Sequence, residues 1–168
     1  MLVIGIDPGT AITGYGLVSE DERGDLRAVA YGVVTTKAKL PMPERLLVLH
    51  RELREILARY RPESGAVEKL FFQRNVTTAI SVGQARGVSL LALAEAGLPV
   101  AEYTPMEIKQ AVAGYGGADK HQVQYMVRAL LGLEETPRPD DAADALAVAI
   151  CHLHTARTRR MAEEGGGA

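Results

Sequence analysis

Apolar and β-branched residues open the chain in three short segments separated by turn residues, which is the pattern of consecutive strands. The segments are residues 2–7, 12–18 and 26–35, with Pro8-Gly9 between the first two and a polar stretch at 21–25 between the others. Short connections of this kind join antiparallel strands. The pattern therefore predicts a three-stranded antiparallel sheet at the start of the chain.

The apolar spacing then changes to the period of a helix. Leucine and isoleucine recur every three or four residues from 46 to 57, between Pro43 and a stop at Arg61-Pro62. Apolar runs at 64–68 and 99–103 have the length of buried strands. If the helix is a right-handed crossover, the fourth strand pairs with the first in parallel. The predicted fold class is α/β, a mixed five-stranded sheet of three antiparallel strands and then two parallel strands, flanked by helices.

The helix that Asn75 is expected to cap carries almost no polar face. Such a helix is either a central core helix or covered by a second subunit, with Gly83, Ala85 and Gly87 allowing close approach. Both interpretations stay open on the sequence. Three more helices are predicted after it, the last of them running to about Arg160.

Length, composition and charge limit the possible functions. The chain has 168 residues, a formal net charge of −2 and a single cysteine, which excludes an internal disulfide. That length suits one domain over residues 1–155, followed by a disordered tail over 156–168. With this charge, any nucleic-acid partner must bind a local cationic face. No charged leader or bilayer-spanning segment is recognisable, so we expect a cytoplasmic protein without a membrane partner.

Two carboxylates end predicted strands. Asp7 closes the first strand and Glu68 closes the fourth. Parallel neighbours bring their carboxyl ends to the same edge of a sheet, where open sheets place their chemistry. Because side chains alternate along a strand, Asp7 shares a face with Val3 and Gly5, opposite to the isoleucines. Each acid alone is explained equally well as a solvated strand end.

Two further acids lie at the start of the last predicted helix. Asp141 and Asp144 are three residues apart, so their side chains point from one face of the helix. Acids in a first helical turn also satisfy free backbone amides, so capping alone explains Asp140 or Asp141. Asp144 is harder to explain, because small apolar residues surround it and an unpaired buried carboxylate costs on the order of several kcal/mol.

An acidic set drawn from two strand ends and one helix start is typical of a site for hard divalent cations. Mg²⁺ prefers carboxylate oxygens and keeps several waters. Two such ions can bracket a phosphodiester, one activating water and one stabilising the leaving oxygen. The pattern predicts hydrolysis with about two Mg²⁺ per site, for which Mn²⁺ can substitute. The expected ligands are Asp7, Glu68, Asp141 and Asp144.

Six short motifs follow one another along the chain. They are Gly5-Ile-Asp-Pro-Gly9, Val67-Glu-Lys-Leu-Phe71 with Asn75, Gly83-Gln-Ala-Arg-Gly87, Lys109-Gln-Ala-Val-Ala-Gly114, Gly117-Ala-Asp-Lys120 and Asp141-Ala-Ala-Asp-Ala-Leu146. In these motifs the sequence resembles the RuvC family of Holliday-junction resolvases. The first motif alone is unspecific, but the ordered set covers nearly the whole chain.

The resemblance implies an RNase H-like nuclease domain and a homodimer that binds four-way junction DNA. Each subunit would nick one of two opposing strands by metal-dependent hydrolysis. The resemblance also implies a thymine-rich preference at the cut and cooperation with the RuvA and RuvB branch-migration proteins. The family's acidic ligands fall on the four acids named above, where either Asp140 or Asp141 can supply the third ligand.

Rings and cations complete the predicted DNA-binding surface. The family's stacking phenylalanine falls on Phe71, with Phe72 as the alternative, and its functional lysines fall on Lys109 and Lys120. Lys120 is also expected to act in catalysis, because the glycine-rich loop before it can bring its ammonium close to developing charge. Each cation taken alone is better explained as a solvated surface side chain. The expected DNA-binding residues are Phe71, Phe72, Arg74, Arg86, Lys109 and Lys120.

Three other functions are weighed against junction cleavage. A sugar-kinase or actin-like ATPase also begins with a strand, an aspartate and a glycine turn, but it needs two lobes to enclose a nucleotide. A junction-binding protein without catalysis gains nothing from acids that repel phosphate. Another RNase H-like nuclease, acting on RNA, would use the same acids and is the main alternative on chemistry alone.

Overall fold

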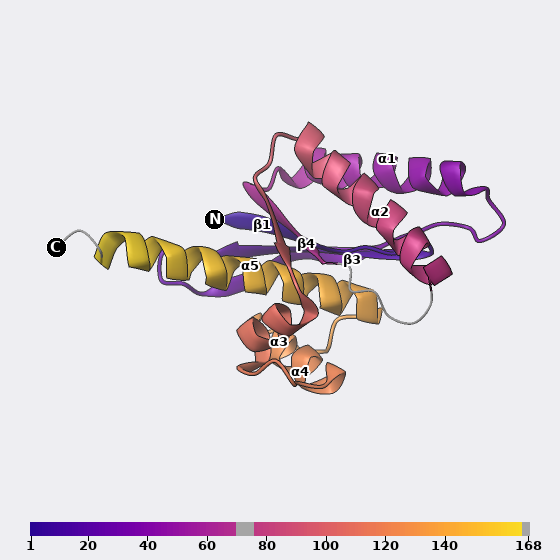
Figure 1. Ribbon diagram of the computed structural model, residues 1–168. Coiled ribbons are helices and arrows are strands. Elements are labelled where there is room, and N and C mark those ends of the chain that lie inside the picture. The colour runs from indigo at the N-terminus through magenta and orange to yellow at the C-terminus, as the bar shows by residue number, and fades with distance from the viewer. Residues whose placement is uncertain (70–75, 166–168) are drawn as a thin grey trace.

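The computed structural model describes residues 1–69 and 76–165, which form one mixed sheet covered by helices (Figure 1). The strands are β1 (Leu2–Asp7), β2 (Ile12–Glu20), β3 (Leu26–Thr35), β4 (Ser64–Glu68) and β5 (Val100–Tyr103). The helices are α1 (Met42–Tyr60), α2 (Val76–Glu95), α3 (Pro105–Ala113), α4 (Lys120–Leu130) and α5 (Asp140–Gly165).

The sheet has the order β3-β2-β1-β4-β5, which places β1 at its centre. β1 pairs antiparallel with β2, so that Asp7 lies opposite Gly14. On its other side β1 pairs in parallel with β4, and Ile6 lies beside Val67. β2 and β3 pair antiparallel, and β4 and β5 pair in parallel. The predicted sequence of three antiparallel strands and then two parallel strands is confirmed.

Helices cover both faces of the sheet, with α1 and α2 on one face and α5, α3 and α4 on the other (Figure 1). Val3 of β1 is fully buried in a core that it shares with α5. Ile4 and Ile6 are fully buried in a second core with α1 and α2. The alternation predicted for β1 is therefore present, and it directs Asp7 to the α5 face.

Two glycines allow α5 to lie directly against the centre of the sheet. A Cβ atom added to Gly5 would overlap the carbonyl oxygen of Ala145. One added to Gly14 would overlap the carbonyl oxygen of Asp141. Only residues without a side chain permit two backbones to approach so closely. These glycines of β1 and β2 thereby fix the start of α5, which carries Asp141 and Asp144.

Side-chain caps fix the starts of α3 and α4. Thr104 accepts a hydrogen bond from the backbone amide of Glu107, and Asp119 accepts one from the amide of Gln122. In both helices the third residue returns a bond to the cap, which completes a capping box. Lys120 is therefore held as the first residue of α4.

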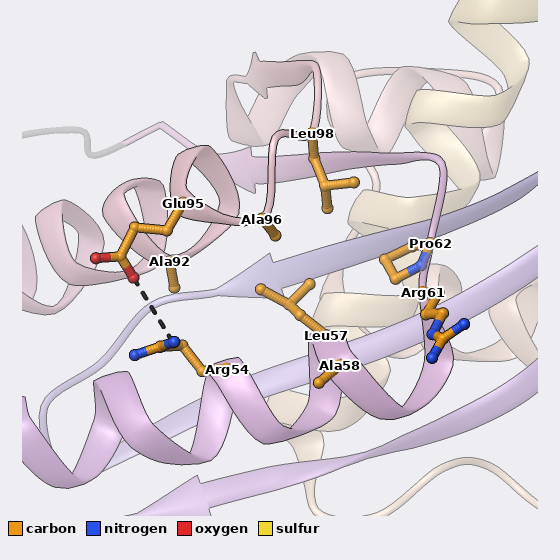
Figure 2. Close-up of a pocket in the computed structure, with 9 residues that line it drawn as sticks. All are labelled: Arg54, Leu57, Ala58, Arg61, Pro62, Ala92, Glu95, Ala96 and Leu98. Atoms are coloured by element: carbon orange, nitrogen blue, oxygen red, sulfur yellow. Dashed lines mark ion pairs between the residues drawn. The ribbon is translucent and has the colours of Figure 1, made fainter.

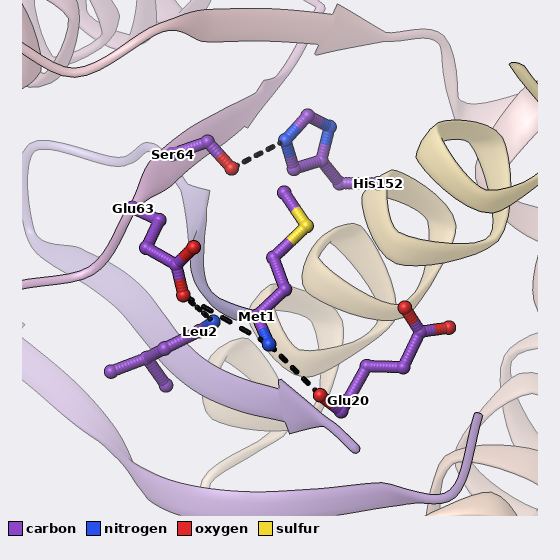
Figure 3. A network of polar contacts seen from close by, with 6 residues as sticks. All are labelled: Met1, Leu2, Glu20, Glu63, Ser64 and His152. Carbon is purple, nitrogen blue, oxygen red and sulfur yellow. Dashed lines mark hydrogen bonds and ion pairs between the residues drawn. The ribbon is translucent and has the colours of Figure 1, made fainter. Parts of the chain in front are cut away.

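Polar contacts tie α5 and the start of the chain to the sheet (Figure 3). The ring nitrogens of His152 on α5 lie 2.9 Å from Ser64 Oγ and 2.9 Å from the Tyr103 hydroxyl. Burial lowers the pKa of His152, so the neutral ring is favoured between these two partners. The amine of Met1 donates to the carbonyl oxygen of Glu20 at 2.9 Å.

α2 packs on α1, β4 and β5 but leaves an apolar face outside. Val76, Ile80 and Leu91 are 72%, 59% and 52% exposed. Among the described residues α2 is the one helix long and apolar enough, by length and composition, to cross a membrane. The expectation that no segment has this length was therefore wrong. A single such helix is weak evidence for a membrane span, because core helices share its length and composition.

α5 continues past its predicted end near Arg160 and reaches Gly165. Residues 156–165 are helical, although a disordered tail was expected there. Their alanine, arginine, methionine and glutamate residues favour a helix, which explains the difference.

Candidate active site

Asp7 and Glu68 meet at the carboxyl edge of the sheet, where the adjacent parallel strands β1 and β4 end. Their side chains share a hydrogen bond. Burial, followed by the charges of Glu68, Asp144 and Asp141, raises the pKa of Asp7 to about 8. Burial also raises the pKa of Glu68. The two carboxyl groups therefore hold a proton between them at neutral pH.

The first turns of α5 bring two more acids to this edge. Burial raises the pKa of Asp144, and the nearby Lys120 ammonium partly offsets that effect. The charge of Asp141 raises the pKa of both Asp7 and Asp144, so Asp141 lies near these two acids. Ala142, Ala143 and Ala145 are fully or almost fully buried, which confirms the apolar surroundings predicted for Asp144.

Lys120 enters the same site from the start of α4. Its Nζ atom lies 3.1 Å from Asp140 Oδ2 and 3.4 Å from Asp144 Oδ2. Burial lowers the pKa of Lys120, but the hydrogen bond to Asp140 and the charge of Asp144 outweigh it, so the net shift is upward. Asp140 also accepts a hydrogen bond from Arg138 at 3.1 Å. The two adjacent aspartates differ in their surroundings. Asp140 contacts two cations, whereas the charge of Asp141 raises the pKa of Asp7, and both aspartates raise the pKa of Asp144.

A pocket of about 200 Å³ opens beside these residues. Its apolar wall comes from α3, α4 and α5. Its charged wall brings together residues from four of the sequence motifs, although they are far apart along the chain. The lining residues are Glu68, Lys109, Lys120 and Asp144 with Pro105, Ile108, Val123 and Ala147.

The donor set of this edge fits a hard divalent cation. It consists of carboxylates, the ligands that Mg²⁺ and Mn²⁺ prefer. Asp7 and Glu68 are joined by a shared proton and not by a neighbouring cation. Asp144 and Asp140 both pair with the single ammonium of Lys120, so the negative charge of this group of acids is only partly compensated. As these side chains are oriented, no three His, Cys, Asp or Glu residues in the described part of the chain are grouped to hold one ion.

The remaining predicted DNA-binding residues have different outcomes. Phe71, Phe72 and Arg74 lie outside the described residues. Arg86 of α2 forms an ion pair with Glu102 of β5, and both side chains are largely buried. This pairing gives Arg86 a structural role between α2 and the sheet, and its phosphate contact stays a prediction.

A second pocket, of about 420 Å³, lies between α1 and α2 (Figure 2). Arg61 and Leu98, which precede β4 and β5, form part of its wall, so it lies at the opposite edge of the sheet from Asp7. Arg54 and Glu95 face each other across it at 3.8 Å. It contains none of the predicted site residues.

Comparison with known proteins identifies the family. The family model described as crossover junction endodeoxyribonuclease RuvC matches residues 3–152. The chain belongs to this family. RuvC of Chloroflexus aurantiacus is 63% identical over 158 residues, which are 94% of this chain and 96% of that protein.

Two solved RuvC structures resemble this fold closely. Thermus thermophilus RuvC has a TM-score of 0.88 at 46% identity, covering 94% of this chain and 96% of that chain. T. thermophilus RuvC in complex with a Holliday junction substrate has a TM-score of 0.86 at 44% identity, with the same coverage of both chains. The RNase H-like fold implied by the sequence resemblance is confirmed.

Family membership makes the chain a crossover junction endodeoxyribonuclease. It overturns the kinase-like or actin-like ATPase alternative and the alternative of a junction binder without catalysis. It also overturns the alternative of a nuclease acting on RNA, because the RuvC family cuts DNA.

Sequence reasoning missed two features of the site. Gly5 and Gly14 place α5 close enough to bring its acids to Asp7, and the only sequence signal was the glycine spacing within two strands. The contact between Asp140 and Lys120 had no sequence signal beyond the two neighbouring acids.

Proposed function

We propose that this RuvC-family protein resolves four-way DNA junctions by metal-dependent hydrolysis at the carboxyl edge of its sheet. The observation that carries the proposal is the convergence of Asp7, Glu68 and Asp144 beside Lys120. Three carboxylates whose pKa values are raised by burial are a poor surface for phosphate unless cations bind there. Their grouping therefore supports catalysis rather than DNA binding alone.

Asp7, Glu68, Asp141 and Asp144 are the proposed ligands of two Mg²⁺ ions, for which Mn²⁺ can substitute. When bound, such cations neutralise charge on a phosphodiester and acidify water. A cation bound between Asp7 and Glu68 would favour the ionised form of both carboxylates, so their shared proton would leave. Asp141 is the preferred third ligand, since Asp140 is held by Lys120 and Arg138.

Two lysines of the pocket hold the DNA backbone. Lys120, at the start of α4, contacts a phosphate oxygen and balances charge that develops there. Lys109, on α3, lies near enough for its charge to oppose the upward shift that burial gives the pKa of Glu68. Lys109 contacts the neighbouring phosphate. On a chain of net charge −2 these local contacts make binding salt-dependent.

The segment between β4 and α2 contacts the DNA at the junction. Phe71, or Phe72 in its place, stacks on an unpaired base, a contact worth about 1–3 kcal/mol. Arg74 contacts a phosphate beside it. These roles rest on the sequence alone.

The active form is a homodimer that pairs through α2. Ile80, Gly87 and Leu91 recur at helical spacing on its outer face, and two of them are more than half exposed. A Cβ atom on Gly87 would meet nothing within 4 Å, so a second helix can approach closely there. An exposed apolar stripe of this kind supports an isologous contact. Two subunits then present one site to each of two opposing strands.

The wider setting follows from the family resemblance. Cooperation with RuvA and RuvB, a thymine-rich cut site and a cytoplasmic location stay predictions. The buried, reduced Cys151 agrees with a reducing compartment.

A synthetic four-way junction tests the proposal. With Mg²⁺ we expect paired nicks in two opposing strands, and with EDTA we expect none. A linear duplex of the same sequence is the control substrate and should be cut far more slowly. Cleavage without a divalent cation, or equal cutting of the linear duplex, would contradict the proposal.

A further inference from the structure

Asp140 and Asp141 are adjacent acids at the start of α5, but their surroundings separate them. Asp141 raises the pKa of Asp7 and therefore lies close to the acid cluster. Asp140 raises the pKa of Asp144 but is not among the charges that raise the pKa of Asp7. Its carboxylate instead contacts two cations, one from α4 and one from the loop before α5. On the sequence both residues are candidate metal ligands. In the structure Asp141 lies with the other acids, whereas Asp140 pairs with Lys120 and Arg138.

The two oxygens of Asp140 have different partners. Oδ2 lies 3.1 Å from the Lys120 ammonium, and Oδ1 accepts a hydrogen bond from the Arg138 guanidinium at 3.1 Å. Because Arg138 holds one oxygen, the carboxylate has a fixed direction, and its other oxygen stays aimed at Lys120. Asp140 thereby connects the first residue of α4 with the first residue of α5.

Lys120 has a second acidic partner, Asp144, at 3.4 Å. The proposed function assigns Asp144 to a divalent cation, which would compete with the lysine for that carboxylate. Asp140 is then the acid that continues to hold Lys120. A flexible four-carbon side chain needs such a partner to keep its ammonium in one place.

We propose that Asp140 is a positioning residue that holds the Lys120 ammonium at the scissile phosphate, and that it is not a metal ligand. This inference rests on the proposed function, because it acts through the catalytic role given to Lys120. The Lys120 and Asp140 side chains are 52% and 41% exposed. Exposed ion pairs contribute little to folding stability, so their contact matters for placement more than for the fold.

Asp140→Asn is the direct test, because it removes the charge and keeps the shape. We expect the single-turnover cleavage rate at saturating protein to fall about tenfold, with the junction Kd and the melting temperature unchanged. Asp140→Glu, which restores the charge, should recover most of the rate. Asp25→Asn, in the exposed turn between β2 and β3 at the other edge of the sheet, is the matched control and should cleave like the wild type.

Combining the change with Lys120→Ala separates positioning from ligation. If Asp140 acts only through Lys120, Asp140→Asn should have no further effect in the Lys120→Ala background. The Mg²⁺ concentration for half-maximal rate should also be the same in Asp140→Asn as in the wild type. An additive loss together with a raised Mg²⁺ requirement would overturn the inference and make Asp140 a ligand.

Two other results are distinguishable. Wild-type cleavage by Asp140→Asn would overturn the positioning role and leave the proposed function intact. A wild-type protein that does not cut junctions in Mg²⁺ would overturn the proposed function, and the inference would fall with it. Unfolding of Asp140→Asn, seen as a lower melting temperature that Asp140→Glu does not restore, would show a structural role instead.

Discussion

Asp7 is an acid whose ionisation opposes folding of the metal-free protein. The carboxyl pKa of an aspartate without such surroundings is 3.8, whereas burial, then the neighbouring carboxylates, raise the pKa of Asp7 to about 8. A group whose pKa is raised by folding contributes stability that is fully present below the unfolded pKa and is lost as the pH rises through the folded pKa. Metal-free protein should therefore lose this contribution between about pH 4 and pH 8.

Asp7→Asn removes the charge with little change in volume. In EDTA we expect the variant to melt about 3–6 °C above the wild type at pH 8 and close to it at pH 4. In Mg²⁺ it should bind the junction without cutting it. Scanning calorimetry and a cleavage assay check the two parts. Equal melting temperatures for the two proteins at pH 8 would contradict the assignment of a destabilising charge to Asp7.

The sequence was informative about single acids where their neighbours along the chain decide their environment. The alanines around Asp144 correctly predicted an apolar setting, because a helix surrounds each residue with its own sequence neighbours. Asp140 could not be distinguished from Asp141 in this way. Its role depends on Lys120, which is distant in sequence and comes close only because α4 lies beside α5.

At the scale of elements, the contact between α5 and the central strands decides the shape of the site. The strand periodicity predicted that Asp7 shares a face of β1 with Val3 and Gly5, and in the structure α5 covers that face. The depth of the contact was not predictable, because a glycine in a strand does not reveal which backbone approaches it. Here the approaching backbone is the start of α5, next to Gly14.

Gly14→Ala should displace the start of α5 from β2. The added Cβ atom would overlap the carbonyl oxygen of Asp141, and a backbone group cannot move aside as a flexible side chain does. We expect a loss of about 1–3 kcal/mol in the free energy of unfolding and a larger relative loss of cleavage, since Asp141 and Asp144 move with the helix. Denaturant unfolding and single-turnover cleavage measure both. Unchanged cleavage would show that α5 tolerates the shift.

His152 makes the attachment of α5 to β4 and β5 sensitive to acid. Burial, then the charge of Arg159, lowers its pKa, so the unfolded chain binds a proton that the folded protein resists. Stability from this group is therefore lost as the pH falls below about 6.5. His152→Gln should lose less stability than the wild type between pH 7.5 and 5.5. Because Asp7 acts in the opposite direction, the difference between the two proteins is the quantity to measure, by denaturant unfolding in EDTA.

At the scale of the whole molecule, strand order and helix positions followed from the pattern of apolar residues and helix caps. Two features did not. α2 was read as either a core helix or an interface helix, and only the exposure of Ile80 and Leu91 favours the second. The ion pair of Arg86 with Glu102 of β5 was not predicted either, and the DNA contact of Arg86 stays a prediction. The exposed face of α2 and the Arg86–Glu102 ion pair both depend on which side of α2 packs against the sheet. That side cannot be predicted from the sequence of a helix that is apolar on nearly all sides.

The outer face of α2 gives the prediction that concerns the assembly. Ile80→Lys with Leu91→Lys places two charges on the proposed contact while both side chains remain solvated in the monomer. We expect the mass measured by light scattering to fall from that of a dimer to that of a monomer. The melting temperature of the monomer should stay high enough for binding studies. Paired nicks should be replaced by rare single nicks. Val29→Lys, a change at an apolar residue 47% exposed on the edge strand β3, is the matched control and should remain dimeric. A double variant that stays dimeric and still makes paired nicks would exclude α2 as the contact between subunits.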